Sequence, residues 1–300
     1  MIDTRLLIDA DNHLGEGPLW DVAEQRLYWI DSTAAEIASC RADGSDVRRY
    51  FVPRHIGSMA LREQGGAVVS LANGLHFYDF EHQTVSLIAD PEADEPETRF
   101  NDGKVDRRGR FVVGSMAYDF DRYEADRGQR PMRLGALYRL DPDGSVTTLD
   151  RAITCSNGPC WSPDNKTLYF TDTYDKQMYA YDYDIETGAV ANRRVFASAH
   201  NMAGTFDGAT VDAEGNYYAA MFEGAQVVKL SPAGEVLAEI PVPAQCPTMP
   251  CFGGDDLKTL YLTTARHNRP AAELEKYPLS GGLLSMQVDV PGLPVNFYRD

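Results

Sequence analysis

The chain has 300 residues, of which 43% are hydrophobic and 24% are charged, and its formal net charge is −17 at pH 7. This composition is typical of a soluble globular protein, and the negative charge disfavours nucleic acids and anionic membranes as partners. No apolar run approaches the roughly 20 residues of a membrane-spanning helix. The N-terminal stretch lacks the basic-then-apolar pattern of a secretion signal, so we expect a cytoplasmic protein.

The cysteines give no sign of a disulfide or zinc framework. The chain has five of them, an odd number, and the pairs Cys155/Cys160 and Cys246/Cys251 lack the C-x₂-C spacing and the histidine partners of a zinc site. We therefore expect buried free thiols in a reducing compartment.

One segment occurs twice along the chain. Residues 15–31 (GEGPLWDVAEQRLYWID) match residues 156–172 (SNGPCWSPDNKTLYFTD), with Gly-Pro before the tryptophan and Leu-Tyr-aromatic after it. Each copy is typical of two short strands joined by a polar turn. The tryptophan position recurs in six repeats at intervals of 41 to 56 residues, at Trp20, Leu61, Val105, Trp161, Val211 and Phe252.

Each repeat continues into a second pair of strands, so the pattern is four short strands repeated six times. Period-two alternation without long helical periodicity indicates an all-β chain, and this repeat predicts a six-bladed β-propeller. We expect one domain over residues 1–300. The sixth repeat would end in a strand pair within residues 283–298 (LLSMQVDVPGLPVNFY), and residues 5–10 would close the ring by pairing with the last blade.

The longer intervals between repeats are explained by inserted loops. The two main insertions are residues 117–134 and residues 182–202. The first is charged and aromatic, and it fits either a lid over one face or a solvated loop.

The position four residues before each anchor carries the candidate chemistry. It should lie just before the innermost strand and point into the central channel, and it is occupied by Glu16, Gly57, Asn101, Asn157, Asp207 and Thr248. Such residues also cap turns in ordinary β proteins. Carboxylates that converge in a channel repel unless a cation neutralises them, and oxygen ligands suit Ca²⁺, Mg²⁺ or Mn²⁺. We favour a metal site at Glu16, Asn157 and Asp207.

Five segments together resemble the sugar-lactonase family, which includes gluconolactonases, regucalcin (senescence marker protein) and luciferin-regenerating enzyme. They are LGEGPLW, RFNDGKVDRRGRFVVGSM, SNGPCWSPDNKTLYFTDT, DGATVDAEGNYYAAM and PCFGGDDLKTLYLTTAR. The resemblance implies a six-bladed propeller with one catalytic divalent cation, which could be Ca, Mg, Mn, Zn or Fe. By motif it implies Glu16, Asn157 and Asp207 as metal ligands. It also implies four substrate-binding residues, Arg99, Asn101, Tyr118 and Asp119.

The predicted function is metal-dependent hydrolysis of a sugar (aldono)lactone to its aldonic acid by a metal-activated water. Asp207 is the candidate general base, and the cation would stabilise the oxyanion. A phosphotriesterase or aryl-esterase on the same fold is one alternative, because a channel cation also polarises P=O. A non-catalytic calcium-binding propeller is the other. We expect a monomer whose partner is a small-molecule lactone.

Overall fold

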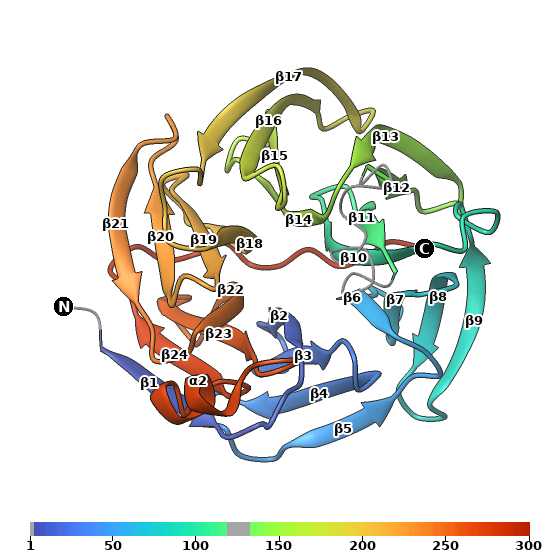
Figure 1. Cartoon of the computed structure of the whole chain (residues 1–300). Helices are drawn as coiled ribbons and strands as arrows, with labels where there is room; N and C mark the ends of the chain where they lie inside the picture. Colours follow the sequence, from blue (N-terminus) through green and yellow to red (C-terminus); the bar gives the residue numbers. More distant parts are fainter. Residues whose placement is uncertain (1–2, 119–132) are drawn as a thin grey trace.

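The computed structural model describes residues 3–118 and 133–300. Six four-stranded antiparallel sheets surround a central axis (Figure 1), which confirms the predicted six-bladed β-propeller. In five blades the strands follow chain order from the axis outward, and the innermost strands are the most buried.

The strands of the first three blades in chain order have the following bounds: β2 (Gly15–Asp21), β3 (Arg26–Asp31), β4 (Glu36–Arg41) and β5 (Arg48–Phe51); β6 (Ile56–Leu61), β7 (Ala67–Leu71), β8 (Gly74–Asp79) and β9 (Thr84–Ala89); β10 (Thr98–Val105), β11 (Phe111–Ala117), β12 (Gly135–Leu140) and β13 (Val146–Ile153). The next two blades contain β14 (Ser156–Trp161), β15 (Thr167–Asp172), β16 (Gln177–Asp184) and β17 (Ala189–Ser198); β18 (Thr205–Val211), β19 (Tyr217–Phe222), β20 (Gln226–Leu230) and β21 (Val236–Pro241).

The last blade closes the ring with both ends of the chain. It contains β22 (Cys246–Gly253), β23 (Thr259–Ala265), β24 (Leu283–Gln287) and, as its outermost strand, β1 (Thr4–Ile8). β1 runs antiparallel to β24, with Thr4 opposite Met286. The predicted closure by the N-terminal segment is therefore confirmed.

Aspartates and glycines shape the turns that lead out of the inner strands. The Asp106 carboxylate accepts the N–H of Arg108 at 2.8 Å, and Gly109 completes this turn with φ +81°. Asp212 and Gly215, whose φ is +86°, repeat the arrangement after β18. Left-handed backbone suits glycine, so these residues fix each hairpin locally.

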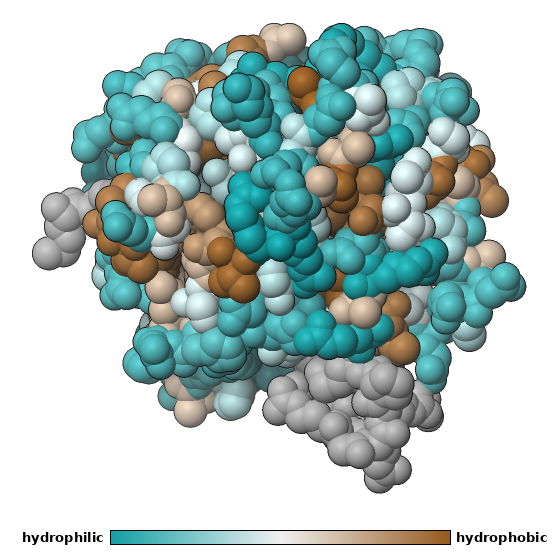
Figure 2. Space-filling view, turned by 90° about the horizontal axis from the view of Figure 1, so that it is seen from above, coloured by the Kyte–Doolittle hydropathy of each residue, from teal (hydrophilic) through white to brown (hydrophobic). Residues whose placement is uncertain are grey.

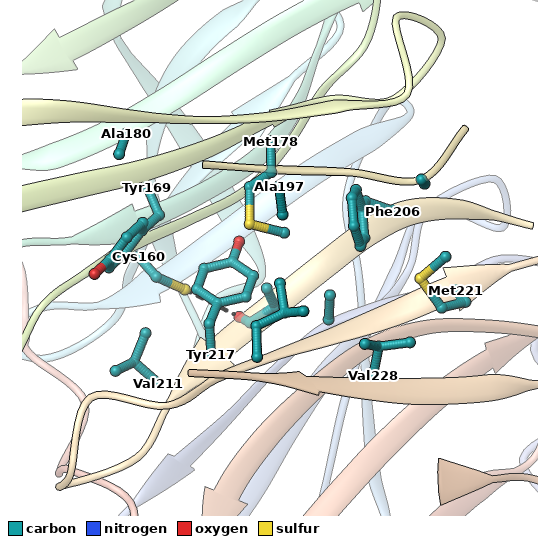
Figure 3. Close-up of a cluster of buried hydrophobic side chains, with 14 residues drawn as sticks. Cys160, Tyr169, Met178, Ala180, Ala197, Phe206, Val211, Tyr217, Met221 and Val228 are labelled. Carbon is teal, nitrogen blue, oxygen red and sulfur yellow. Dashed lines mark hydrogen bonds between the residues drawn. The ribbon is translucent and has the colours of Figure 1, made fainter. Parts of the chain in front are cut away.

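Aromatic and aliphatic side chains fill the space between neighbouring blades. Figure 3 shows one such cluster between the β14–β17 and β18–β21 sheets, where the rings of Tyr169 and Tyr217 lie 5.4 Å apart. The rings of Trp20 and Tyr261 stack between the first and last blades. All five cysteines are buried and free, as predicted. The edge of the ring seen in Figure 2 is mainly hydrophilic.

The C-terminal residues depart from the predicted pattern. The expected strand pair within residues 283–298 is wrong, because only β24 forms and β1 takes the outer position of that blade. Residues 291–300, here called the C-terminal strap, cross the middle of the ring instead (Figure 1). Tyr298 anchors the strap: its N–H donates to the carbonyl of Leu61 at 2.8 Å and its hydroxyl to the carbonyl of Asp141 at 2.7 Å.

The two predicted insertions have different outcomes. Residues 182–202 are not a loop, because most of them extend the hairpin of β16 and β17. Most of the segment 117–134 lies outside the described residues. The described part also contains a short helix, α2 (Ala271–Lys276), and no helix in it is long and apolar enough to cross a membrane.

Candidate metal centre

The three predicted metal ligands lie on the innermost strands of three blades. Glu16 is on β2, Asn157 on β14 and Asp207 on β18. Each lies within the first three residues of its strand, rather than just before the strand as predicted. A register shift begins at Glu16 and at Asn157, and Asp207 lies within a third shift. After Glu16 and Asn157 a glycine takes positive φ. Such bulges re-aim side chains out of the regular pleat.

The two carboxyl groups share a buried and electrostatically unfavourable setting. Glu16 and Asp207 are each 7% exposed. Burial, and next the charge of Asp207, raise the pKa of Glu16 well above its usual value. Burial, and next the charge of Asp102, do the same to the pKa of Asp207. Like charges gathered in a low-dielectric channel require neutralisation by protons or by a cation.

Hydrogen bonds fix the amide of Asn157. Its Nδ2 donates to Oγ1 of Thr173 at 2.8 Å, and that hydroxyl donates to the carbonyl of Phe206, the residue before Asp207. Its Oδ1 accepts a 2.8 Å hydrogen bond from Nδ2 of Asn101. Because an amide oxygen has two lone pairs, the Asn157 oxygen can still bind a cation.

Arg99 and Asn101, which the family resemblance implies as substrate-binding residues, lie close to the candidate metal ligands: Asn101 bonds to Asn157, and the charge of Glu16 acts on Arg99. Arg99 donates from Nη1 to Oδ1 of Asn101 at 3.0 Å, and its side chain is largely buried. Burial lowers the pKa of the Arg99 guanidinium, although it lies in the field of Glu16.

Of the other two predicted substrate residues, the structure describes only Tyr118, which directly follows β11. Tyr118 is 49% exposed, and its ring lies 6.4 Å from that of His55. Asp119 lies outside the described residues.

Two of the six equivalent positions are used for packing. A Cβ on Gly57 would lie 2.5 Å from the carbonyl oxygen of Phe100, so glycine allows β6 to approach β10 closely. Thr248 donates its hydroxyl to the carbonyl of Gly15 and joins the first and last blades. Neither residue therefore offers a free ligand atom comparable with those of Glu16 or Asp207.

Sequence reasoning missed a third carboxylate, that of Asp102. It is 1% exposed and accepts the N–H of Gly158 at 2.9 Å. Burial raises the pKa of Asp102 to about 6, against the opposing effects of the Gly158 hydrogen bond and the charge of Lys104. Asp102 falls within the register shift of β10 between Phe100 and Gly103, and its charge acts on Glu16 and Asp207. A comparison of one position per repeat does not detect it.

His55 was also missed. Its Nδ1 is buried without a hydrogen-bond partner within the described part of the chain. Burial, followed by the charges of Arg99 and His267, lowers the pKa of the imidazole to about 3. A neutral imidazole with an unused polar atom beside Arg99 could bind a substrate hydroxyl. The only sequence signal is the position of His55 just before β6.

The oxygen donors fit a hard divalent cation. Glu16 and Asp207 supply carboxylates and Asn157 supplies an oriented amide oxygen, a set suited to Ca²⁺ or Mg²⁺ with water in the remaining positions. Among the described residues no group of three or more His, Cys, Asp or Glu is placed to hold a metal. The candidate ligands are two carboxylates, Glu16 and Asp207, and the amide of Asn157. A site of this composition would not appear among groups of three His, Cys, Asp or Glu residues.

Comparison with known proteins identifies the family. The family model described as SMP-30/Gluconolactonase/LRE-like region matches residues 14–266. The chain belongs to this family. The match covers all six inner strands and every predicted site residue.

Individual members of the SMP-30/gluconolactonase/LRE-like family match over almost the whole chain. A 6-deoxy-6-sulfogluconolactonase of Pseudomonas putida is 38% identical over 93% of this chain and 92% of its own. A regucalcin of Xenopus laevis is 36% identical over 94% of this chain and 93% of the regucalcin chain. The solved structure of a calcium-binding protein, regucalcin, from Agrobacterium tumefaciens is 26% identical with a TM-score of 0.91, covering 100% of this chain and 98% of the other.

Proposed function

We propose that the protein is a metal-dependent lactonase that hydrolyses a sugar lactone to the aldonic acid. One observation carries the proposal: two buried carboxyls, Glu16 and Asp207, converge from different blades beside the oriented amide of Asn157. Within the described chain no lysine or arginine forms an ion pair with either carboxyl. Membership of a family with lactonase relatives supports the same reading.

The cation would be held by Glu16, Asn157 and Asp207, and when bound it would polarise the lactone carbonyl and lower the pKa of water. Asp207 is the general base, which accepts a proton from the attacking water at a carboxylate oxygen. The water oxygen adds to the carbonyl carbon, the ring C–O bond breaks, and the proton passes to the ring oxygen as it leaves. The product is the open-chain acid.

Arg99 and Asn101 orient the substrate. The guanidinium of Arg99 is largely buried and tied to Asn101, so its direction is fixed before a lactone arrives. Pre-orientation of this kind reduces the entropy lost on binding and aligns the carbonyl with the water. We expect Arg99→Ala to raise KM more than it lowers kcat.

The test is acid release from five- and six-membered aldonolactones. Chelator-stripped protein is compared with protein supplied with Ca²⁺, Mg²⁺, Mn²⁺ or Zn²⁺, and spontaneous hydrolysis is subtracted. The panel includes a lactone with an anionic group at C6, because one relative is named a 6-deoxy-6-sulfogluconolactonase. Metal-restored turnover supports the proposal and ranks the substrates.

Other outcomes favour other functions. Turnover of aryl esters or phosphotriesters without lactone turnover would favour the esterase alternative. Tight Ca²⁺ binding without turnover of any of these substrates would favour a calcium-binding propeller, a reading related to the calcium-binding regucalcin structure.

A further inference from the structure

A cavity of about 130 Å³ lies in the central channel on the far side of the candidate metal centre. All six inner strands line it, and the C-terminal strap contributes Leu293 to Asn296. Its lining begins one residue beyond Glu16, at Gly17, and includes Trp161 at the end of β14 and Val211 at the end of β18. We call this cavity the axial chamber. It is separate from the oxygens of Glu16, Asn157 and Asp207, none of which lines it.

The walls of the axial chamber are mainly apolar. The aliphatic and thioether side chains that line it are those of Leu19, Met59, Leu61, Val105, Val211, Met249, Leu293 and Val295. An apolar protein cavity of about 150 Å³ accommodates a benzene molecule. The axial chamber, at about 130 Å³, is close to this size, so it suits a small apolar body such as one aromatic ring.

The charged groups of the chamber are all cationic. Lys104 and Arg107 line it, and no aspartate or glutamate does. The ammonium of Lys104 donates to the carbonyl of Ala209 and to Sγ of Cys160. Since an ammonium has three donors, one remains for a ligand. Arg107 is exposed, and its guanidinium forms no hydrogen bond or ion pair with any residue of the described chain.

These groups exclude several other ligands. Two cationic side chains in the lining disfavour a metal ion, although Cys160 and Cys251 also line the chamber. Burial raises the pKa of the Cys251 thiol to about 12, so it is a poor ligand and a poor nucleophile at neutral pH. A sugar would leave most of its hydroxyls against aliphatic walls without partners.

We propose that the axial chamber is a second binding site, for a small carboxylate with an apolar body. The apolar part would lie among Met59, Val211 and Met249, and the carboxylate would bind Lys104 and Arg107. A guanidinium can bind both oxygens of a carboxylate, and a few polar groups in an otherwise apolar pocket are typical of small-molecule sites. The site does not depend on the proposed lactonase activity.

The test uses benzoate as the anionic probe and benzyl alcohol as its neutral counterpart of similar size. Calorimetry measures affinity in chelator-stripped protein and again with Ca²⁺. Tryptophan fluorescence reports the location, because Trp161 lines the chamber whereas Trp20 and Trp29 are buried elsewhere. We expect one saturable site for benzoate, a change in fluorescence that Trp161→Phe removes, and no dependence on Ca²⁺.

Variants separate this site from the metal centre. Arg107→Ala removes an exposed side chain and should fold normally, keep its lactone turnover, and bind benzoate at least about 10-fold more weakly. Lys104→Met should weaken binding further, and Asp207→Asn should leave benzoate binding unchanged. The proposal is overturned if benzyl alcohol binds as tightly as benzoate, or if benzoate does not bind at millimolar concentration. It is also overturned if benzoate binding requires Ca²⁺, or if Arg107→Ala binds benzoate with unchanged affinity.

Discussion

Nδ2 of Asn101 lies 2.8 Å from Oδ1 of Asn157 and joins the inner strands of two neighbouring blades, β10 and β14. The same Nδ2 donates to the carbonyl of Ser156, and Oδ1 of Asn101 accepts from Arg99. A residue implied to bind substrate therefore also holds a candidate metal ligand in place. We therefore expect substrate binding and cation binding to be linked through the amide of Asn101.

Asn101→Asp tests this relationship. The substitution keeps the shape but replaces the donor with an acceptor, so Oδ1 of Asn157 would face a carboxylate oxygen and turn away. We expect Ca²⁺ affinity to fall about 10- to 100-fold, the usual cost of losing a group that orients a ligand. Calorimetric titration with Ca²⁺ measures the affinity. Asn101→Ser serves as a comparison in which we expect a smaller loss of affinity. Unchanged affinity in Asn101→Asp would show that this contact does not orient the ligand.

Asp207→Asn should separate stability from activity. The variant removes a buried charge from a group of carboxyls, so the metal-free protein should melt at a higher temperature than the wild type at pH 7. Turnover should fall at least about 100-fold because the base is lost. Added Ca²⁺ should raise the melting temperature of the wild type but hardly that of the variant.

Asp255→Asn, which changes an exposed carboxylate, is the control for that experiment. It should leave both the melting temperature and the turnover unchanged. Full turnover in metal-replete Asp207→Asn would rule out the proposed base.

His55 should make the protein sensitive to acid. Its pKa is lowered to about 3 in the folded state, whereas an unfolded histidine titrates near 6.5. The unfolded chain therefore binds the proton first, and the free energy of unfolding declines as pH falls below about 6.5. We expect His55→Phe to lose less stability than the wild type between pH 7 and pH 5, by the order of 1 kcal/mol.

Urea unfolding at the two pH values measures this difference. His200→Asn, at an exposed histidine, should behave like the wild type. An equal loss of stability in His55→Phe and wild type would show that His55 does not remain neutral. Separately, His55→Phe should raise KM for the lactone if the unused Nδ1 binds a substrate hydroxyl.

Tyr298 should be important for the stability of the ring. Its side chain is fully buried, and its hydroxyl donates to the carbonyl of Asp141. Tyr298→Ala should cost about 3–5 kcal/mol in the free energy of unfolding, and Tyr298→Phe about 1 kcal/mol. Denaturant unfolding measures both, and Arg299→Ala at an exposed neighbour should have a small effect. A small loss in Tyr298→Ala would mean that the strap is only loosely attached.

The sequence predicted five of the six blades well because each of these five is built from strands that are consecutive in the chain. Gly-Pro before Trp20 or Trp161 and the polar turns after them are repeated signals, and comparing the copies identifies equivalent positions on the inner strands. The comparison could not separate Glu16 from Thr248, because the carbonyl that Thr248 binds belongs to a strand at the other end of the chain.

The features that were missed depend on backbone irregularity and long-range contacts. Asp102 lies within the register shift of β10, and a strict period of two does not represent such a shift. The strap has no counterpart in the other five repeats, so residues 283–298 were interpreted by analogy with them. Its contacts with Leu61 and Asp141 join segments far apart in sequence.

The pairing of β1 with β24 has a consequence for biosynthesis. Thr4 is synthesised long before its partner Met286, because the two residues are far apart in the sequence. Until β24 has been made, β1 has no partner strand and the growing set of blades has an open end. Such unpaired strand edges favour association with other chains. A chain that stops before Leu283 cannot close, so we expect unfinished products to be bound by chaperones or degraded, and only complete chains to accumulate.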